Sequence, residues 1–362
     1  MMSDEDGSGS LGGSGSLTEV NERRTGGGQG AAGPLDERQA AAAGGEGFPE
    51  GGVRSSDEES ERTGEGGQAG PETPLIESVS EDVAPAVGEF MEQAAQQNEA
   101  AASEASSETG GSEPGPYISF EGVSKAFGDF VVLQDVNFYV KAGETICILG
   151  RSGVGKSVSL QMLLGFLKPD SGVVRVAGED ITGFSERELQ GIRRKVTMVF
   201  QNGALFDSIT VGENVAFPLR ERGELAEEQM QQIVKGLLEM VGVAGMEGLL
   251  PSDLSTGMKR SVAIARALAC QPEAVLYDEP TTMVDPLMGH LLGDLIERLK
   301  QQLHLTSIVV THDMRFAKKL ADRVVFLHEG RARFFGTMQE MEASEDPVLQ
   351  EFFSLDALVL PE

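Results

Sequence analysis

The feature that most restricts the fold is a Gly-rich loop set between an apolar strand and an apolar helix. Residues 145–150 read TICILG, a continuous apolar run typical of a strand that is covered on both faces. GRSGVGKS follows from Gly150 to Ser157, and residues 158–167 are apolar again, as in a helix. Further strand-like runs alternate with helical ones along the chain, which predicts an α/β fold with a parallel sheet.

The loop has the composition of a phosphate-binding site. Its glycines let backbone N–H groups surround phosphate oxygens without a Cβ in the way. The helix that begins near Lys156 adds the positive end of its dipole, and the Lys156 ammonium reaches the β- and γ-phosphates. Ser157 provides a hydroxyl ligand for Mg²⁺. We therefore expect ATP and Mg²⁺ to bind here, through Gly150, Ser152, Gly153, Gly155, Lys156 and Ser157.

Polar residues follow three other apolar runs, where strands are expected to end. Asp278 and Glu279 follow AVLY, and carboxylates beside a phosphate loop suit a Mg²⁺ ligand and a group that polarises the attacking water, respectively. His312, in IVVTHD, is expected to hydrogen-bond the γ-phosphate. Gln201, which ends KVTMVFQ, can contact the Mg²⁺ shell or the attacking water. Phe127 either stacks on an adenine ring or belongs to the core.

Taken with the stretch LSTGMKR at residues 254–260, these motifs resemble the ATP-binding cassette of ABC transporters. The resemblance identifies Gly150–Ser157 as Walker A, AVLYDE as Walker B, Gln201 as the Q-loop residue and His312 as the switch histidine. It also implies that two cassettes meet head to tail. Ser255 and Gly257 of the signature, and Asp285 of the D-loop, would then act at the nucleotide of the partner cassette.

Composition divides the chain into unequal parts. Residues 1–116 contain 24 acidic and 5 basic residues among Gly, Ser and Ala, and so few apolar residues that we expect a disordered tail. In EDVAPAVGEFMEQAAQQ, residues 81–97, apolar side chains do recur at helical spacing, either as a transient helix for a partner or as a fluctuating stretch. Removing residues 1–115 is expected to leave stability nearly unchanged.

The folded part is expected from residue 117 to about 355, with a short C-terminal end at 356–362. Alternating patterns at 117–127 and 131–140 predict an antiparallel β subdomain, and the helical block at about 203–270 predicts an inserted helical subdomain. Together with the phosphate loop, these elements describe a P-loop NTPase cassette with a long N-terminal tail.

A narrower resemblance suggests what the cassette serves. VFQNGALFDSITVGENVAFPLRE, LSTGMKR and the ending DPVLQEFF resemble the ATPase subunits of Mla/MCE-type systems, which move phospholipids or other hydrophobic molecules. This resemblance implies a membrane permease and an MCE-domain lipid-binding protein as partners, at the cytoplasmic face of the inner membrane. Thr256 departs from the Gly usual in the signature, and TTMVDP departs from the usual D-loop while keeping Asp285.

Other functions remain open or are disfavoured. The main alternative is that the chain is the ATPase subunit of a different ABC importer, one that carries amino acids or other solutes. A soluble cassette acting on DNA or ribosomes is less favoured, because the chain has a net charge of −29 and no basic stripe to bind nucleic acid. No secretory signal or membrane span is evident, and the two cysteines lie in apolar runs, as buried thiols do.

Overall fold

The computed structural model describes residues 79–107 and 115–359. The disorder expected for residues 1–78 and 108–114 lies outside this part of the chain. A central six-stranded sheet has the strand order β10-β9-β3-β8-β7-β6. The strands are β3 (Thr145–Leu149), β6 (Val196–Val199), β7 (Ala274–Asp278), β8 (Thr306–Val310), β9 (Arg323–His328) and β10 (Arg331–Gly336). Only β10 is antiparallel to its neighbour in this sheet.

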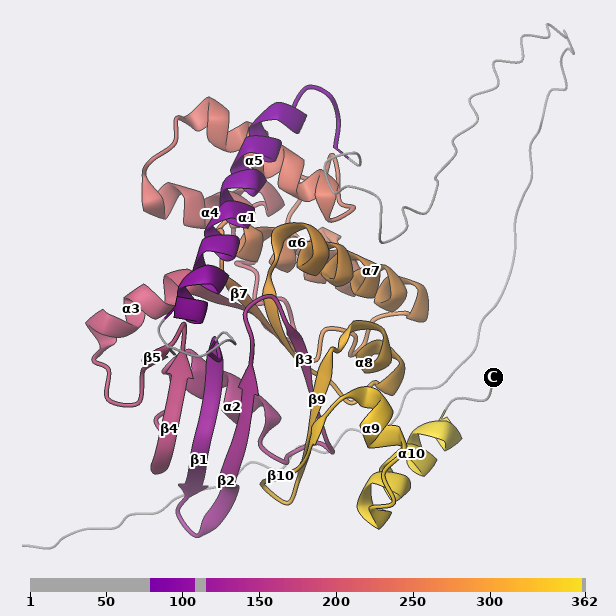
Figure 1. The fold of residues 1–362 in the computed structure, drawn as a ribbon. Helices are drawn as coiled ribbons and strands as arrows, with labels where there is room; N and C mark the ends of the chain where they lie inside the picture. Colours follow the sequence, from indigo (N-terminus) through magenta and orange to yellow (C-terminus); the bar gives the residue numbers. More distant parts are fainter. Residues whose placement is uncertain (1–78, 108–114, 360–362) are drawn as a thin grey trace, which may run out of the picture. The chain divides into compact units, whose positions relative to one another are not determined.

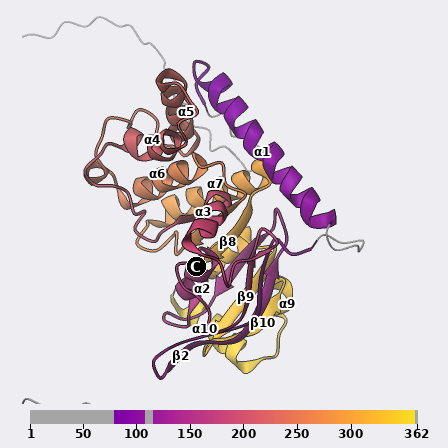
Figure 2. The ribbon, with the colours of Figure 1, turned by 90° about the vertical axis from the view of Figure 1, so that its left-hand side faces the viewer.

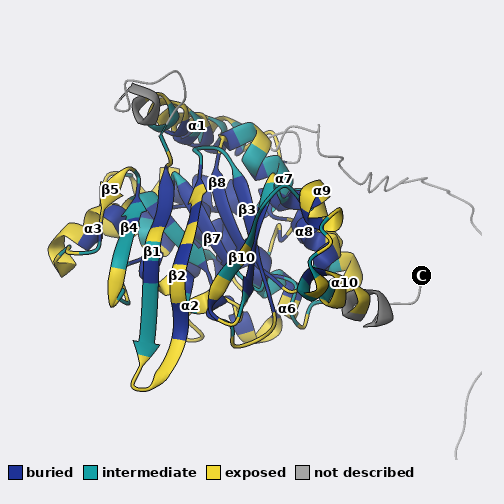
Figure 3. Ribbon diagram, turned by 60° about the horizontal axis from the view of Figure 1, so that its bottom comes forward, coloured by how far each residue is buried: buried dark blue, intermediate teal, exposed yellow. Residues whose placement is uncertain are grey.

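The central sheet is buried because its strands are apolar on both faces. All five residues of β3 and all five of β8 are buried, and these strands are dark blue in Figure 3. Two hydrophobic clusters meet the sheet from opposite sides, so alternate residues such as Cys147 and Ile148 enter different clusters. The parallel α/β core expected from the strand, loop and helix order is confirmed.

A second, antiparallel sheet has the order β2-β1-β4-β5. Its strands are β1 (Ile118–Phe127), β2 (Phe130–Val140), β4 (Ser171–Val176) and β5 (Glu179–Asp180). Along β2, buried and exposed residues partly alternate, because one face covers the core and the other meets solvent. The tip of the β1–β2 hairpin is exposed and appears yellow in Figure 3.

Helices surround the two sheets (Figure 1). The helical block expected at about 203–270 contains α4 (Val211–Arg222), α5 (Glu227–Met240), the 3₁₀ turn Pro251–Asp253 and α6 (Thr256–Leu268). The other helices after β1 are α2 (Lys156–Leu163), α3 (Glu186–Lys195), α7 (Pro286–Leu303), α8 (Met314–Leu320), α9 (Met338–Glu342) and α10 (Pro347–Val359). Helix α10 continues past the boundary that we placed at residue 355.

The prediction of disorder through residue 116 is wrong for residues 79–107. Residues 84–107 form helix α1 (Ala84–Ser107), which lies beside α5 and α7 (Figures 1 and 2). The apolar stripe of residues 79–91 is buried in the same cluster as α5 and α7. Val79 and Val83 directly precede the helix, and Val87, Phe90 and Met91 lie on it. Burial of these apolar side chains against α5 and α7 offsets the conformational entropy that the segment loses when it becomes ordered. The average composition of residues 1–116 did not predict this burial.

Candidate nucleotide-binding site

Four neighbouring strands deliver the predicted site residues to one edge of the central sheet. Because β3, β8, β7 and β6 are parallel and adjacent, their carboxyl ends lie together. Gly150 follows β3, His312 follows β8, Glu279 follows β7 and Gln201 follows β6. The sequence separates these residues by up to 162 positions, but the sheet order brings them to one place.

The loop before α2 has a backbone that only glycine accommodates at two points. Gly150 has φ +148° and Gly155 has φ +102°, both in the region that side chains disfavour. A Cβ on Gly150 would lie 2.4 Å from the Leu327 carbonyl oxygen, and one on Gly155 would lie 2.6 Å from Leu133 Cδ2. The two glycines therefore let the loop pack closely against β9 and β2.

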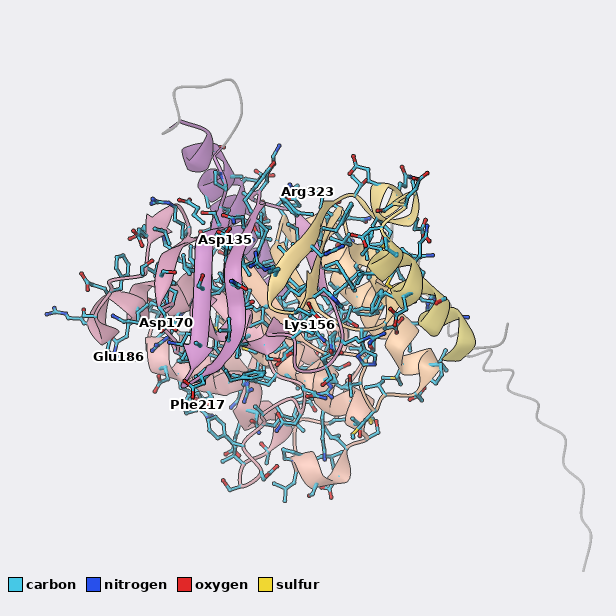
Figure 4. All side chains as sticks on the ribbon, turned by 90° about the horizontal axis from the view of Figure 1, so that it is seen from below. Asp135, Lys156, Asp170, Glu186, Phe217 and Arg323 are labelled. Atoms are coloured by element: carbon cyan, nitrogen blue, oxygen red, sulfur yellow. The ribbon has the colours of Figure 1, made fainter. Side chains whose placement is uncertain are left out.

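Lys156 is a buried cation at the bottom of the site and lies near the middle of the molecule in Figure 4. Its ammonium donates to the carbonyl oxygens of Gly150, at 2.7 Å, and Arg151, at 3.1 Å. The Glu279 carboxylate is 3.4 Å away. This ammonium is thus held inside the loop whose N–H groups surround the expected phosphates.

Ser157 and Asp278 form an oxygen pair at the start of α2 and the end of β7. The Ser157 hydroxyl donates to Asp278 Oδ1 at 3.0 Å. Burial raises the pKa of Asp278, an effect that the Ser157 hydrogen bond opposes and the neighbouring Glu279 charge reinforces. A charged partner, such as a cation, would relieve this desolvation.

Glu279 is the centre of a small polar network. One carboxylate oxygen, Oε2, lies 2.7 Å from His312 Nδ1 and accepts from the Thr282 hydroxyl at 3.3 Å. The Glu279 backbone has φ +48°, a left-handed conformation that costs a non-glycine residue about 1–2 kcal/mol. Such strain persists only where surrounding structure holds it, here through the Glu279 N–H bonded to Val310 O at 2.8 Å.

Most of these groups border a cleft of about 710 Å³, but Asp278, which is bonded to Ser157, is not among the lining residues. The predicted residues that line it are Gly150, Ser152, Gly153, Gly155, Lys156, Ser157, Gln201, Glu279 and His312. Among the residues described, no cluster of three or more His, Cys, Asp or Glu could hold a metal unaided. Two oxygen donors beside a phosphate loop nevertheless fit Mg²⁺, which usually takes one or two carboxylates and completes its shell with phosphates and water.

Phe127 is not among the residues that line the cleft. Its ring is half exposed, so it is not the core residue that we weighed as the alternative, and Lys125 Nζ lies 5.7 Å from the ring centroid. Five lining residues were missed: Arg151 and Val158 beside predicted positions, Val132 of β2, Thr282, and Phe352 of α10. Thr282 lies three positions after Glu279, so its closeness in sequence to a predicted site residue could have identified it. Phe352 lies 195 positions after Ser157, and no nearby motif marks it as part of the site.

The signature and D-loop residues do not line this chain's own cleft. Ser255 Oγ caps α6 by accepting from the Met258 N–H at 3.3 Å, and Asp285 Oδ1 caps α7 by accepting from the Met288 N–H at 3.0 Å. Ser255 and Thr256 are exposed, whereas Gly257 is buried against Met288. The exposed α6 terminus is therefore available to a second molecule.

Comparison with known proteins identifies this arrangement. Residues 133–282 match the ABC transporter family. The chain is 40% identical over 225 residues to the intermembrane phospholipid transport system ATP-binding protein MlaF of Haemophilus influenzae, covering 62% of this chain and 85% of MlaF. It is 38% identical over 256 residues to the chloroplastic protein TRIGALACTOSYLDIACYLGLYCEROL 3 of Arabidopsis thaliana, covering 65% and 72%.

Two further proteins bear on function. The methionine import ATP-binding protein MetN of Rhizobium johnstonii is 40% identical over 228 residues, covering 63% of this chain and 62% of MetN. Among solved structures, the dimeric post-hydrolysis state of the ATP-binding cassette MJ0796, bound to ADP and Pi, superimposes with a TM-score of 0.57 at 32% identity. That match covers 61% of this chain and 98% of MJ0796. In residues 79–107 and 115–359, no helix is long and apolar enough to cross a membrane.

Proposed function

This chain belongs to the ATP-binding subunits of ABC transporters, and we propose that its ATPase activity moves phospholipids or other hydrophobic molecules between membranes. The observation that carries the proposal is the 40% identity over 85% of MlaF, whose name states intermembrane phospholipid transport. The relative TRIGALACTOSYLDIACYLGLYCEROL 3, which is named after a galactolipid, supports the same class of cargo.

The residues around the cleft suit hydrolysis of ATP to ADP and phosphate. Loop N–H groups and the α2 terminus bind the phosphates, and Lys156 places its charge on the β- and γ-phosphates. Glu279 accepts a proton from the attacking water, because its carboxylate lies 3.4 Å from the Lys156 ammonium that binds the terminal phosphates in this proposal. His312, 2.7 Å from Glu279, orients that carboxylate and contacts the γ-phosphate, while Gln201 contacts the water.

Ser157 and Asp278, with Gln201 nearby, would hold Mg²⁺, which neutralises charge on the phosphate oxygens when bound. Adenine would stack on an aromatic ring near the β1–β2 hairpin, and Phe127 remains our candidate for this contact, although it lies outside the cleft lining. Phe127 would have to meet the base beyond the edge of the phosphate site.

A second cassette completes the site. ABC cassettes form dimers, as the MJ0796 structure illustrates, and work with a membrane permease. In our proposal, Ser255, Gly257 and Asp285 of one chain act on the ATP held by the Lys156 of its partner. Ser255 is exposed and is not among the residues that line the chain's own cleft, which supports this role. Thr256 keeps a backbone N–H for the phosphate.

The permease is proposed to anchor the chain peripherally at the cytoplasmic face of the inner membrane, with an MCE-domain protein as the lipid carrier. Import of a small solute is the second candidate, because MetN, a methionine import protein by name, is equally identical to this chain. The nucleotide site is the same in both cases, so cargo must be tested directly.

The test uses the full chain with its own partners. The tagged chain is purified from native membranes in mild detergent, and co-purifying proteins are identified by mass spectrometry. The complex is then placed in phospholipid vesicles, where we expect ATP-dependent transfer of labelled phospholipid to acceptor vesicles. Uptake of amino acids without lipid transfer would favour the importer, and the absence of any permease would overturn the transporter role.

A further inference from the structure

The phosphate loop carries a second positive charge, Arg151, that the loop motif does not require. The position after Gly150 accepts any residue in the pattern G-x-x-x-x-G-K-[ST]. Arg151 nevertheless lines the nucleotide cleft, and among the described residues that line it no other carries a guanidinium. A guanidinium binds phosphate oxygens well, because its parallel N–H groups form two charge-assisted hydrogen bonds at once. Arg151 therefore has the chemistry of a phosphate ligand.

The backbone of Arg151 lies close to the place where the phosphates are expected. Its carbonyl oxygen accepts from the Lys156 ammonium at 3.1 Å, and this ammonium binds the terminal phosphates in our proposal. The two cations differ in freedom. Lys156 is buried and is also bonded to the Gly150 carbonyl, whereas the Arg151 side chain is 54% exposed. Lys156 is thus fixed in place, and Arg151 can change partners.

The partner of Arg151 in this structure lies on the C-terminal helix. Arg151 Nη2 donates to Oε1 of Glu351 on α10 at 2.7 Å. The two residues are 200 positions apart, so the pair forms only because the end of the chain returns to the phosphate loop. Phe352, the next residue of α10, lines the cleft itself. Helix α10 is therefore part of the cleft rim and holds the Arg151 guanidinium there.

Other contacts keep α10 at the rim. Just before the helix, Asp346 Oδ2 accepts from Arg333 Nε of β10 at 2.8 Å. Within the helix, Leu349 is buried, and Phe352 packs on Phe326 of β9 with the ring centroids 4.8 Å apart. None of these contacts involves the phosphate loop. Loss of the ion pair with the loop therefore leaves α10 in place.

The ion pair between Arg151 and Glu351 suits exchange rather than permanent attachment. The two side chains are 54% and 62% exposed, respectively. Water screens such a pair, and holding two long side chains in one geometry costs entropy, so its net contribution is small. A polyphosphate in the loop offers the same guanidinium several anionic oxygens in place of one exposed carboxylate. ATP and Glu351 are therefore competitors for Arg151.

We propose that Arg151 is a phosphate-binding residue and that Glu351 of α10 is its autoinhibitory competitor. When ATP enters the cleft, the guanidinium leaves the Glu351 carboxylate and donates to phosphate oxygens. Because the ion pair must break first, Glu351 lowers the affinity for ATP. The C-terminal helix thereby sets the ATP concentration at which the cassette is loaded. The inference rests on the proposed nucleotide site and adds to it a ligand residue and a control by α10.

The test measures binding of a non-hydrolysable ATP analogue, with Mg²⁺, to the purified full chain by calorimetric titration. Arg151→Ala should raise the dissociation constant about 5-fold or more, because it removes a charge-assisted contact. Glu351→Gln should lower the dissociation constant about 2–5-fold, because the exposed ion pair no longer competes. In an Arg151→Ala chain, the added Glu351→Gln substitution should have no effect, because the competitor has no guanidinium to hold.

The matched control is Glu345→Gln, which removes the same charge from an exposed position just before α10. If this control strengthened binding as much as Glu351→Gln, the effect would be one of net charge and the competition would be overturned. The same conclusion would follow if Glu351→Gln left the affinity unchanged, or acted equally with and without Arg151. Wild-type affinity in Arg151→Ala would remove Arg151 from the phosphates.

Two further measurements separate this inference from folding and from the proposed site. The melting temperatures of the Arg151, Glu345 and Glu351 variants should stay within about 2 °C of wild type, because all three side chains are exposed. Lys156→Ala should bind the analogue far more weakly than any of them. A wild-type chain that does not bind the analogue would overturn the nucleotide site and this inference together. Normal binding in the wild type, with silent Arg151 and Glu351 variants, would overturn this inference alone.

Discussion

The nucleotide cleft and the α1 interface are held by opposite kinds of interaction. The cleft contains a buried ammonium, a carboxylate whose pKa is raised by burial, and a catalytic candidate, Glu279, in a left-handed conformation. The α1 interface contains buried Val83, Val87, Phe90 and Met91, and its hydrogen bonds lie at the ends and edges. The buried charges and strained backbone of the cleft lower the stability of the fold, whereas the apolar contacts of the α1 interface raise it and include no candidate catalytic group.

This difference predicts that mutations will separate cleanly into two classes. Changes in the cleft should alter turnover and leave folding intact or improved. Changes at the α1 interface should alter folding and leave turnover per folded molecule intact. The predictions below test that separation, beginning with the largest effect.

Glu279→Gln should lower the ATP turnover number about 10²–10⁴-fold, because the amide keeps the shape of the side chain and loses its basicity. ATP binding should persist, and dimers should accumulate because the bound ATP is not hydrolysed. Turnover is measured as phosphate release, and dimer formation by size-exclusion chromatography with ATP. A variant that hydrolyses ATP at the wild-type rate would remove Glu279 from the proposed role.

Val87→Asp should lower the melting temperature by roughly 6–12 °C. A carboxylate placed against Gly236 would be buried without a partner, at a cost of about 3 kcal/mol, and each kcal/mol shifts the melting temperature of a domain this size by about 2–4 °C. The basal ATPase rate at 20 °C should stay within about 2-fold of wild type. Removal of residues 1–107 should likewise destabilise the chain, contrary to the expectation from composition.

The matched control is Gln96→Asp, which places the same carboxylate on an exposed position of α1. Surface substitutions of this kind usually change stability by less than about 0.5 kcal/mol. If Val87→Asp melted like this control, α1 would not be part of the folded unit.

The sequence pointed to nine of the residues that line the cleft, because a phosphate-binding loop requires particular residue types at fixed local spacing. A Gly-rich loop, a lysine and strand-end carboxylates can be recognised in windows of ten residues, and sheet topology then assembles them. The apolar strands that deliver them are also locally evident, as in TICILG. The only parts of the cleft without such a signal came from contacts at long range, such as Phe352 of α10.

The α1 interface was missed because apolar docking tolerates many residues and leaves no fixed motif. The recurrence of Val83, Val87 and Phe90 was visible, but its partner surface on α5 lies some 150 positions later in the chain. Averaging composition over 116 residues also hid a 29-residue segment with enough apolar surface to dock. Gly236, the residue that admits Val87, looks like an ordinary helix-weakening glycine until the two helices are seen together.

Asp278→Asn is expected to have the smallest effect on stability, and this effect has the opposite sign to that of Val87→Asp. Burial raises the Asp278 pKa, so ionisation of this carboxylate opposes folding at neutral pH. The amide keeps an oxygen for the Ser157 hydroxyl and removes the charge. We expect the melting temperature at pH 7 to rise slightly, because the charge that opposes folding is gone, while Mg²⁺-dependent ATP hydrolysis is lost.

The pH dependence distinguishes this cause from better packing. Protonation of Asp278 in the wild type removes the penalty, so its melting temperature should approach that of Asp278→Asn as the pH falls toward the raised pKa. Asp170 is the control of opposite sign, because its hydrogen bond with Lys125 lowers its pKa. Asp170→Asn should therefore destabilise the chain near pH 7, and that difference should disappear as acid protonates the wild-type carboxylate through its lowered pKa. A gain in Asp278→Asn that stays constant from pH 7 down to the onset of acid unfolding would show that burial of this charge does not destabilise the cleft.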